Sequence, residues 1–253
     1  MITDWHFYAA AIPGTILLGL GKGGFAGIGM LALPLLSLVM PPLQAAAILL
    51  PILMVQDIVG VWAFRRDVSA AHLKRLFPSA MFGMLIGYFT ASWVSTGFVL
   101  LLVGLIGAVF AVYQFLRSPP AGAPPQQPGM IVTSFWSLIC GFTSFIANAG
   151  GPPFQVVMLP QKLPPRLHAG TQAVFFAVIN YVKFVGFIHL GQVSMANLTT
   201  SAVLFPLAIL ATLGGVWLVK RVSADSFYRV VVTLTFVVGL KLIWDGLRQL
   251  GLF

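Results

Sequence analysis

Acidic residues are scarce in this sequence, and so are charges of either sign. Its 253 residues include five Asp and no Glu, and only 8% of all residues are charged. Hydrophobic residues reach 59%, and the mean hydropathy is +0.99. So apolar a composition excludes a soluble domain and predicts a polytopic membrane protein.

The residues needed for disulfides, metal centres and common catalytic sites are lacking as well. Cys140 is the only cysteine, which excludes an intrachain disulfide and any multi-cysteine metal site. The four histidines have no metal-ligand spacing, and there is no HExxH motif, paired carboxylates or Ser-His-Asp order. Glycines at 19, 21 and 24 match a dinucleotide-binding pattern but follow no predicted strand. We therefore expect no enzyme, no metal and no cofactor.

Basic residues outnumber acidic ones by fourteen to five, which gives a pI of about 10.2. They lie in short loops between apolar segments, where the positive-inside rule places them, and do not alternate with aromatic residues along a surface. This pattern predicts a lipid bilayer as the partner and excludes nucleic acid.

Two glycine-rich breaks interrupt the apolar sequence. The first is Gly19-Leu20-Gly21-Lys22-Gly23-Gly24-Phe25, and the second is Asn148-Ala149-Gly150-Gly151-Pro152-Pro153-Phe154. The segments on either side of the first break are shorter than the roughly 20 residues that cross a bilayer. Two broken helices in corresponding places indicate a secondary transporter built from repeated halves.

The order of segments repeats along the chain. We expect an all-α polytopic membrane protein with two inverted repeats, each a broken re-entrant helix pair followed by three spanning helices. Phe77-Pro78 aligns with Phe205-Pro206, and Gly87 with Gly215, although short apolar matches also arise by chance. The first repeat covers 1–117 (half-helices 5–20 and 26–39, spans 43–64, 76–93 and 98–116), a Pro-rich linker covers 118–130, and the second repeat covers 131–253 (half-helices 131–147 and 154–159, spans 167–190, 198–219 and 227–247).

The basic loops discriminate between two topologies. If each broken pair returns to the side from which it entered, all basic loops fall on one face; if it crosses, the two halves place them on opposite faces. The residues concerned are Arg65, Arg66, Lys74, Arg75, Arg117, Lys162, Arg166, Lys220, Arg221 and Arg229. We therefore expect re-entrant pairs, a cytoplasmic basic face and both termini external.

Polar residues at the breaks and within the spans are candidates for a binding site. A charge at mid-helix costs on the order of 2.5 to 3.5 kcal/mol, and the free N–H groups of a half-helix N-terminus suit an anion. The expected substrate-binding residues are Gly21, Lys22, Gly23, Gly24, Asn148, Ala149, Gly150, Gly151, Gln56, Gln172, Asn180 and Lys183, and the expected coupling or gate residues are Asp57 and Tyr181. The alternatives are close helix packing for the glycines, snorkelling for Lys22, and structural contacts for Asp57 and Lys183.

Asp57 and Lys183 are expected to act separately. Counted from the ends of their spans, they lie roughly 8 to 11 Å apart along the membrane normal. Lys183 would attract the anion on the external side, and Asp57 would be a proton-linked gate on the cytoplasmic side because burial favours a protonated carboxyl.

The Gly21-Lys22-Gly23-Gly24-Phe25 break, the Asn148-Ala149-Gly150-Gly151-Pro152-Pro153 break and the duplicated order of spans resemble the TauE/SafE family of sulfite exporters over nearly the whole chain. The resemblance implies a carrier for sulfite or small organosulfonates in a bacterial inner membrane, within a family that handles varied sulfur-containing or carboxylate anions. We expect a secondary transporter of a small sulfur-containing oxyanion, working in export by alternating access around a central cationic site. An anion channel and a carrier for thiosulfate or a carboxylate remain alternatives, and a homo-oligomer is left open.

Overall fold

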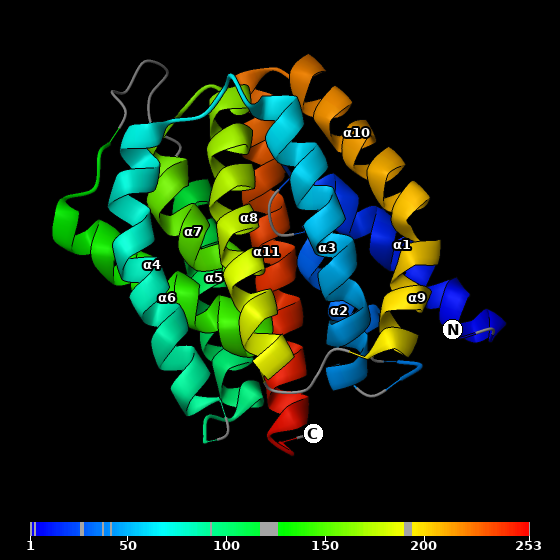
Figure 1. Cartoon of the computed structure of the whole chain (residues 1–253). Coiled ribbons are helices and arrows are strands. Elements are labelled where there is room, and N and C mark those ends of the chain that lie inside the picture. Colours follow the sequence, from blue (N-terminus) through cyan, green and yellow to red (C-terminus); the bar gives the residue numbers. More distant parts are fainter. Residues whose placement is uncertain are drawn as a thin grey trace. The chain divides into compact units, whose positions relative to one another are not determined.

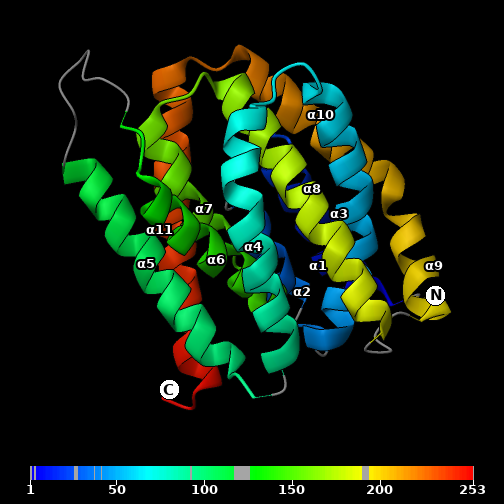
Figure 2. The ribbon, with the colours of Figure 1, turned by 60° about the vertical axis from the view of Figure 1, so that its left-hand side comes forward.

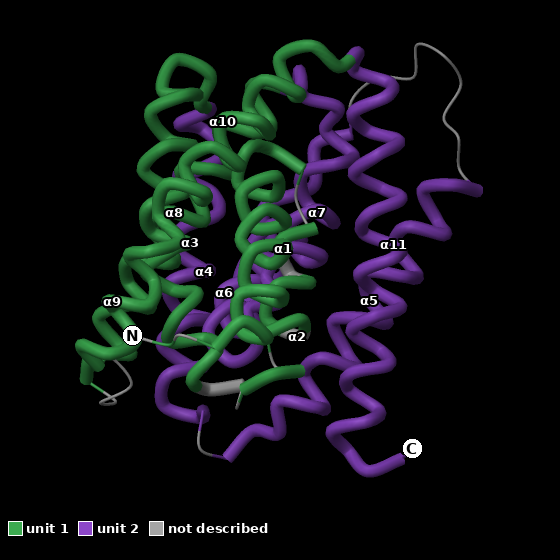
Figure 3. Tube along the Cα trace, turned by 90° about the vertical axis from the view of Figure 1, so that its right-hand side faces the viewer, with its two compact units in different colours: residues 1–68, 166–222 green, residues 69–165, 223–253 purple. Residues whose placement is uncertain are grey.

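The computed structural model describes residues 2, 4–25, 28–36, 38–40, 42–91, 93–116, 126–189 and 194–252. Within these residues every regular element is a helix (Figure 1), which confirms the all-α fold class. The chain divides into two compact units, drawn in different colours in Figure 3. Unit 1 comprises Met1–Val68 and Arg166–Val222, and unit 2 comprises Ser69–Pro165 and Ser223–Phe253.

Several helices have the length and composition of membrane spans. Among the described residues, α3 (Pro42–Phe64), α5 (Thr96–Leu116), α6 (Met130–Ala147), α8 (Pro165–His189) and α11 (Ala224–Gln249) are long and apolar enough to cross a bilayer. A sixth span is present if α9 (Met195–Val203) and α10 (Phe205–Arg221), bent by 52° where they join, cross together. The protein is therefore a multi-pass membrane protein.

Unit 1 begins with a helix against which the next segment of the chain returns. Helix α1 (Trp5–Lys22) starts at Asp4, whose side chain accepts a hydrogen bond from the His6 N–H. After the break come η1 (Ile28–Leu31) and α2 (Ala32–Leu36). A Cβ added to Gly14 would lie 3.1 Å from Leu36, whereas one added to Gly21 would lie 3.0 Å from the backbone of Gly29. The segment after the break therefore runs antiparallel to α1.

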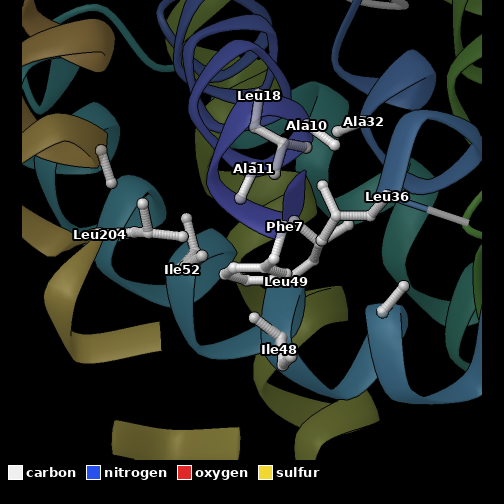
Figure 4. Close-up of a cluster of buried hydrophobic side chains, with 12 residues drawn as sticks. Phe7, Ala10, Ala11, Leu18, Ala32, Leu36, Ile48, Leu49, Ile52 and Leu204 are labelled. Carbon is white, nitrogen blue, oxygen red and sulfur yellow. The ribbon is translucent and has the colours of Figure 1, made fainter. Parts of the chain in front are cut away.

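Small residues let the helices of unit 1 approach closely. The core near the start of α1 joins α1, α2, α3 and the α9–α10 junction (Figure 4). Its members are Phe7, Ala10, Ala11, Leu18, Ala32, Leu36, Ala45, Ile48, Leu49, Ile52, Leu204 and Ala208. Alanines among larger side chains bring the backbones together, which is how helices associate where lipid removes the hydrophobic driving force. Helix α8 runs beside α3 (Figures 1 and 2) and completes the surroundings of the charged residues described below.

Unit 2 contains α4 (Ala70–Thr90), α5, α6, α7 (Gly151–Met158), η2 (Leu159–Gln161) and α11. Helices α5 and α11 lie side by side (Figure 2), with glycines of each helix at their contact. A Cβ on Gly104 would lie 2.7 Å from Gly239 O, and one on Gly97 would lie 3.1 Å from Gly246 O. The pair is therefore antiparallel, and its glycines recur every seven residues on both helices, as along a coiled-coil seam.

The observed elements depart from the expected segments at several places. Helix α4 begins at Ala70 and not at 76, and α7 begins at Gly151 and not at 154. Two further departures have a clear structural reason. The first break was expected to begin at Gly19, but α1 continues to Lys22. Its glycines do not end the helix because α10 packs on them: a Cβ on Gly19 would lie 2.5 Å from Ala211 Cβ. The span expected over 198–219 is divided at Leu204, because Pro206 lies in the first turn of α10 and cannot continue the hydrogen bonding of α9.

Part of the expected organisation lies outside the described residues. This applies to Arg117, to most of the Pro-rich linker, and to the start of the second half-helix at residues 26 and 27. The division into two sequence repeats stays a prediction, because the compact units each combine segments from both halves of the chain.

Candidate functional site

A buried ion pair lies at the end of α1. Lys22 Nζ is 2.6 Å from Asp57 Oδ1, and Asn180 Nδ2 donates to Asp57 Oδ2 over 2.7 Å. Asp57 is 1% exposed and Asn180 5%. Three elements, α1, α3 and α8, thus each contribute one polar side chain to what we call the Lys22 cluster: Lys22, Asp57 and Asn180.

Two glutamine side chains, one from α3 and one from α8, donate hydrogen bonds to backbone carbonyl groups of α1. Gln56 Nε2 donates to Thr15 O over 3.1 Å, and Gln172 Nε2 donates to Gly21 O over 3.4 Å. Both side chains are buried, so each contact satisfies an amide donor that would otherwise cost free energy inside the protein. The amides therefore hold Lys22 at a set position relative to α3 and α8.

Glycines around Lys22 allow the helix backbones to come close to it. A Cβ on Gly60, one turn beyond Asp57, would lie 3.3 Å from Lys22 O, and one on Gly23 would lie 2.5 Å from Gly215 Cα. Gly24 has φ +129, a conformation that side chains disfavour, and a Cβ there would lie 2.7 Å from Val219. The Lys22 cluster is thus built into a tight crossing of α1, α3 and α10.

The other two expected site residues of α8, Lys183 and Tyr181, differ in their exposure. Lys183 is 2% exposed and lies in the same unit as the Lys22 cluster. Tyr181, expected at a gate, is 39% exposed. The separate roles assigned to Lys183 and Asp57 stay a prediction, but Asp57 is not a solitary carboxyl: it is the partner of Lys22.

The backbone N–H groups of the first break are already in use. Gly23 N donates to Gly19 O over 2.8 Å, and Gly24 N donates to Gly21 O over 3.2 Å. These bonds close the last turn of α1, as is usual at a helix C-terminus. Anion binding by the backbone at Gly23 and Gly24 stays a prediction, and in this conformation both N–H groups are hydrogen-bonded to carbonyl groups of α1.

The second break, in unit 2, ends α6 with a left-handed residue. Asn148 has φ 52 and ψ 26, a conformation that Asn tolerates better than most residues. Ala149 N donates to Thr143 O over 3.1 Å, and Cys140 Sγ donates to Gly150 O over 3.1 Å. Pro152 and Pro153 occupy the first turn of α7, as the sequence indicated. Because proline has no N–H, this turn offers fewer backbone donors than an ordinary helix start.

Sequence reasoning identified each member of the Lys22 cluster but missed their pairing and two of their neighbours. The ring centroid of Phe176 lies 5.7 Å from Lys22 Nζ, near enough for a cation–π contact. Gly60 is the second neighbour. Gly60 could have been found as the small residue one turn after Asp57 in a full-length span, whereas no sequence signal separates Phe176 from the other phenylalanines of α8.

The site could exchange the Asp57 carboxylate for a bound anion as the partner of a lysine. Lys22 pairs with the carboxylate of Asp57, and Lys183 is a second basic side chain buried in the same unit, so an oxyanion can compete with the carboxylate for the Lys22 ammonium group. Within the described residues there is no group of three or more metal-ligating side chains. Ionisable residues buried inside a membrane protein mark substrate or ion pathways, because their insertion is costly.

A buried ion pair in a multi-pass helical protein is typical of membrane transport proteins. Residues 11–242 match the family Sulfite exporter TauE/SafE, and the chain belongs to that family. This confirms the resemblance seen in the two breaks. The family consists of membrane transporters and not of enzymes. Searches of curated proteins and of solved structures found no match to the chain.

Proposed function

We propose that this protein is a secondary transporter that exports a small sulfur-containing oxyanion, sulfite or an organosulfonate, by alternating access around the Lys22 cluster. The observation that carries the proposal is the Lys22–Asp57 pair, buried at a helix break with Lys183 buried in the same unit. Family membership supports the substrate class. The proposed setting is the inner membrane of a bacterium.

Charge balance suggests how the anion is bound and released. A monoanion would bind Lys22 in place of Asp57, and the displaced carboxyl would retain the hydrogen bond from Asn180 or take up a proton. Release of the anion would restore the Lys22–Asp57 pair. Lys22 would then have an anionic partner in both the empty and the loaded site, which avoids leaving its charge buried and unpaired.

Matching helix contacts within the two units support the sequence repeat from which an alternating-access carrier would be built. In unit 1, Gly215 of α10 lies against Gly23 of α1; in unit 2, its sequence counterpart Gly87 of α4 lies against Phe145 of α6. One turn earlier, Ala211 of α10 contacts Gly19 of α1 and Gly83 of α4 contacts Leu138 of α6. Corresponding small residues thus pack on the first helix of each broken pair, as expected of two copies of one ancestral unit.

The position of basic residues in unit 1 supports the re-entrant topology. Arg65 and Arg66 follow α3, Arg166 begins α8 and Lys220 ends α10, and all four line one pocket. A crossing topology would put the first two on the opposite side from the others. The antiparallel return of η1 and α2 along α1 is consistent with the same arrangement.

Cysteine accessibility tests this topology. In a Cys140→Ser background, Arg65→Cys and Lys220→Cys are expected to react with an impermeant thiol reagent only from the cytoplasmic side, and Asp4→Cys only from outside. The reason is the clustering of positive charge on one face. Labelling of positions 65 and 220 from opposite sides would rule out the re-entrant arrangement.

The transport proposal is tested with purified protein and liposomes. Sulfite, sulfate, thiosulfate, a sulfonate and a carboxylate are first compared for binding. The best ligand is then followed into liposomes loaded with unlabelled anion, where a carrier shows saturable uptake accelerated by the anion on the opposite side. Protein-free liposomes are the control. Absence of binding by every sulfur anion, or a conductance that does not saturate, would overturn the proposal.

The Asp57→Asn variant tests the proposed gate. We expect anion binding to survive, because Lys22 and Lys183 remain and lose a competitor, while the dependence of flux on a proton gradient disappears because Asn takes up no proton. The matched control is Asp245→Asn, which removes a carboxylate that pairs with Lys241 within α11. Flux in Asp57→Asn that keeps the pH dependence of the unaltered protein would exclude Asp57 as the gate.

A further inference from the structure

A second cationic site lies in unit 1 and shares no residue with the Lys22 cluster. A pocket of about 330 Å³ is lined by Trp62, Ala63, Arg65, Arg66, Asp67, Arg166 and Lys220. It is formed where α3 ends, α8 begins and α10 ends. Because α3 and α8 are long enough to span the membrane, the pocket lies at the level where a bilayer meets water.

The charge of this pocket is strongly unbalanced. Its four basic side chains are exposed and face the single carboxyl of Asp67. No ion pair within 4.0 Å joins Asp67 to any of them in the part of the chain that the structure describes. Four cations with only one carboxyl among them repel one another, and a bound anion reduces that repulsion.

Backbone packing brings these cations together. A Cβ on Gly170 of α8 would lie 2.0 Å from Asp67 O, so only glycine lets the 65–67 loop rest directly on α8. This contact brings Arg66 beside the first turn of α8, where Arg166 lies. Arg65 Nη1 donates to Trp62 O over 2.7 Å, which fixes that guanidinium at the C-terminus of α3. Packing of the backbone thus holds the basic side chains of this pocket together.

Tryptophans and an apolar surface adjoin the cations. The Arg65 guanidinium carbon is 4.9 Å from the Trp62 ring centroid, and that of Arg221 is 4.4 Å from the Trp217 ring centroid. Trp62 is 62% exposed and Trp217 54%. Tryptophan beside arginine at a span end is the pattern of the membrane interface, where the ring sits among the lipid headgroups.

Two exposed apolar stripes lead away from the pocket along the helices. Ile58 lies one turn before Trp62 on α3, and Leu210 and Leu213 lie on the face of α10 that carries Trp217. In a bilayer these stripes would lie along lipid acyl chains, next to the pocket. A small free anion would contact only the basic side chains and not the apolar stripes.

We propose that this pocket binds the phosphate headgroup of an anionic phospholipid, with Arg66, Arg166 and Lys220 as the main phosphate ligands. Basic pockets between the ends of membrane-spanning helices recognise such headgroups through charge and guanidinium hydrogen bonds. The pocket shares no residue with the Lys22 cluster, and the proposal does not depend on which anion the protein transports.

Native mass spectrometry of the full chain in an uncharged detergent tests the proposal. Phosphatidylglycerol and phosphatidylcholine with identical acyl chains are titrated in parallel, and bound lipid is counted. We expect phosphatidylglycerol to be retained preferentially. Arg66→Gln and Arg166→Gln are each expected to weaken its binding about fivefold, and the double variant by on the order of 25-fold, because each removes one cation from the headgroup.

The matched control is Lys74→Gln combined with Arg75→Gln, which removes an exposed basic pair of α4 that does not line the pocket. It is expected to bind phosphatidylglycerol as the unaltered protein does. Lys220→Gln gives an independent variant if the arginine changes impair folding, which thermal unfolding reports. Equal retention of the two lipids, or equal losses in the pocket and control variants, would overturn the proposal. Displacement of the lipid by millimolar inorganic phosphate would overturn it too, because it would indicate a site for free anions.

Discussion

Replacing Lys22 with Met is expected to abolish sulfite transport and to destabilise the protein by about 3 kcal/mol or more. The methionine leaves the Asp57 carboxylate buried without its cationic partner and with the hydrogen bond from Asn180. Breaking a buried pair from one side typically costs about 3 to 5 kcal/mol. It also removes the ammonium group proposed to bind the anion. Thermal unfolding in detergent and uptake into liposomes measure the two effects separately.

The double change Lys22→Met with Asp57→Asn separates stability from function. It removes both charges, so we expect most of the lost stability to return while transport stays absent. Lys22→Arg should retain binding, because it keeps the positive charge. Lys241→Met is the matched control: this lysine pairs with Asp245 but its side chain is 40% exposed, so little stability should be lost. Transport by the double variant would contradict the role of Lys22 as the anion ligand.

Replacing Gly215 with Val is expected to have the second large effect, although Gly215 carries no polar group. A Cβ there would lie 2.9 Å from Gly23 Cα and 3.1 Å from Leu20 Cα, both backbone atoms that cannot rotate away. Helix α10 would have to move off the end of α1, and overpacking of this kind costs about 1 to 3 kcal/mol. Because Gly23 follows Lys22 directly, we also expect the Lys22–Asp57 pair to be disturbed and transport to be lost.

The neighbouring glycine provides the control for this experiment. No atom lies within 4 Å of a Cβ added to Gly214, so Gly214→Val should change stability by less than about 0.5 kcal/mol and leave transport intact. The two variants share the helix, the residue type and the added volume, and differ in the face that carries the side chain. Equal behaviour of the two would show that close approach of α10 to α1 is unimportant.

Membrane insertion and the helical segments were readable from the sequence because they depend on local composition. A span expected over 43–64 lies on α3, and one over 98–116 lies on α5, because a bilayer requires long apolar helices whatever they pack against. The end of α1 was misjudged at Gly19 because glycine destabilises an isolated helix, whereas packing against Ala211 retains it here.

The sequence by itself determined the class of protein, its family and the identity of the polar residues at membrane depth, because charge in an apolar segment is costly and therefore conspicuous. Only the tertiary structure decided that Lys22 pairs with Asp57, that the Gly23 N–H is used within its own helix, and that Arg66 lies near Arg166. These facts depend on contacts between residues far apart in the chain, such as the approach of Asp67 to Gly170. Helix periodicity and composition carry no information about which distant segments will meet, so packing alone settles them.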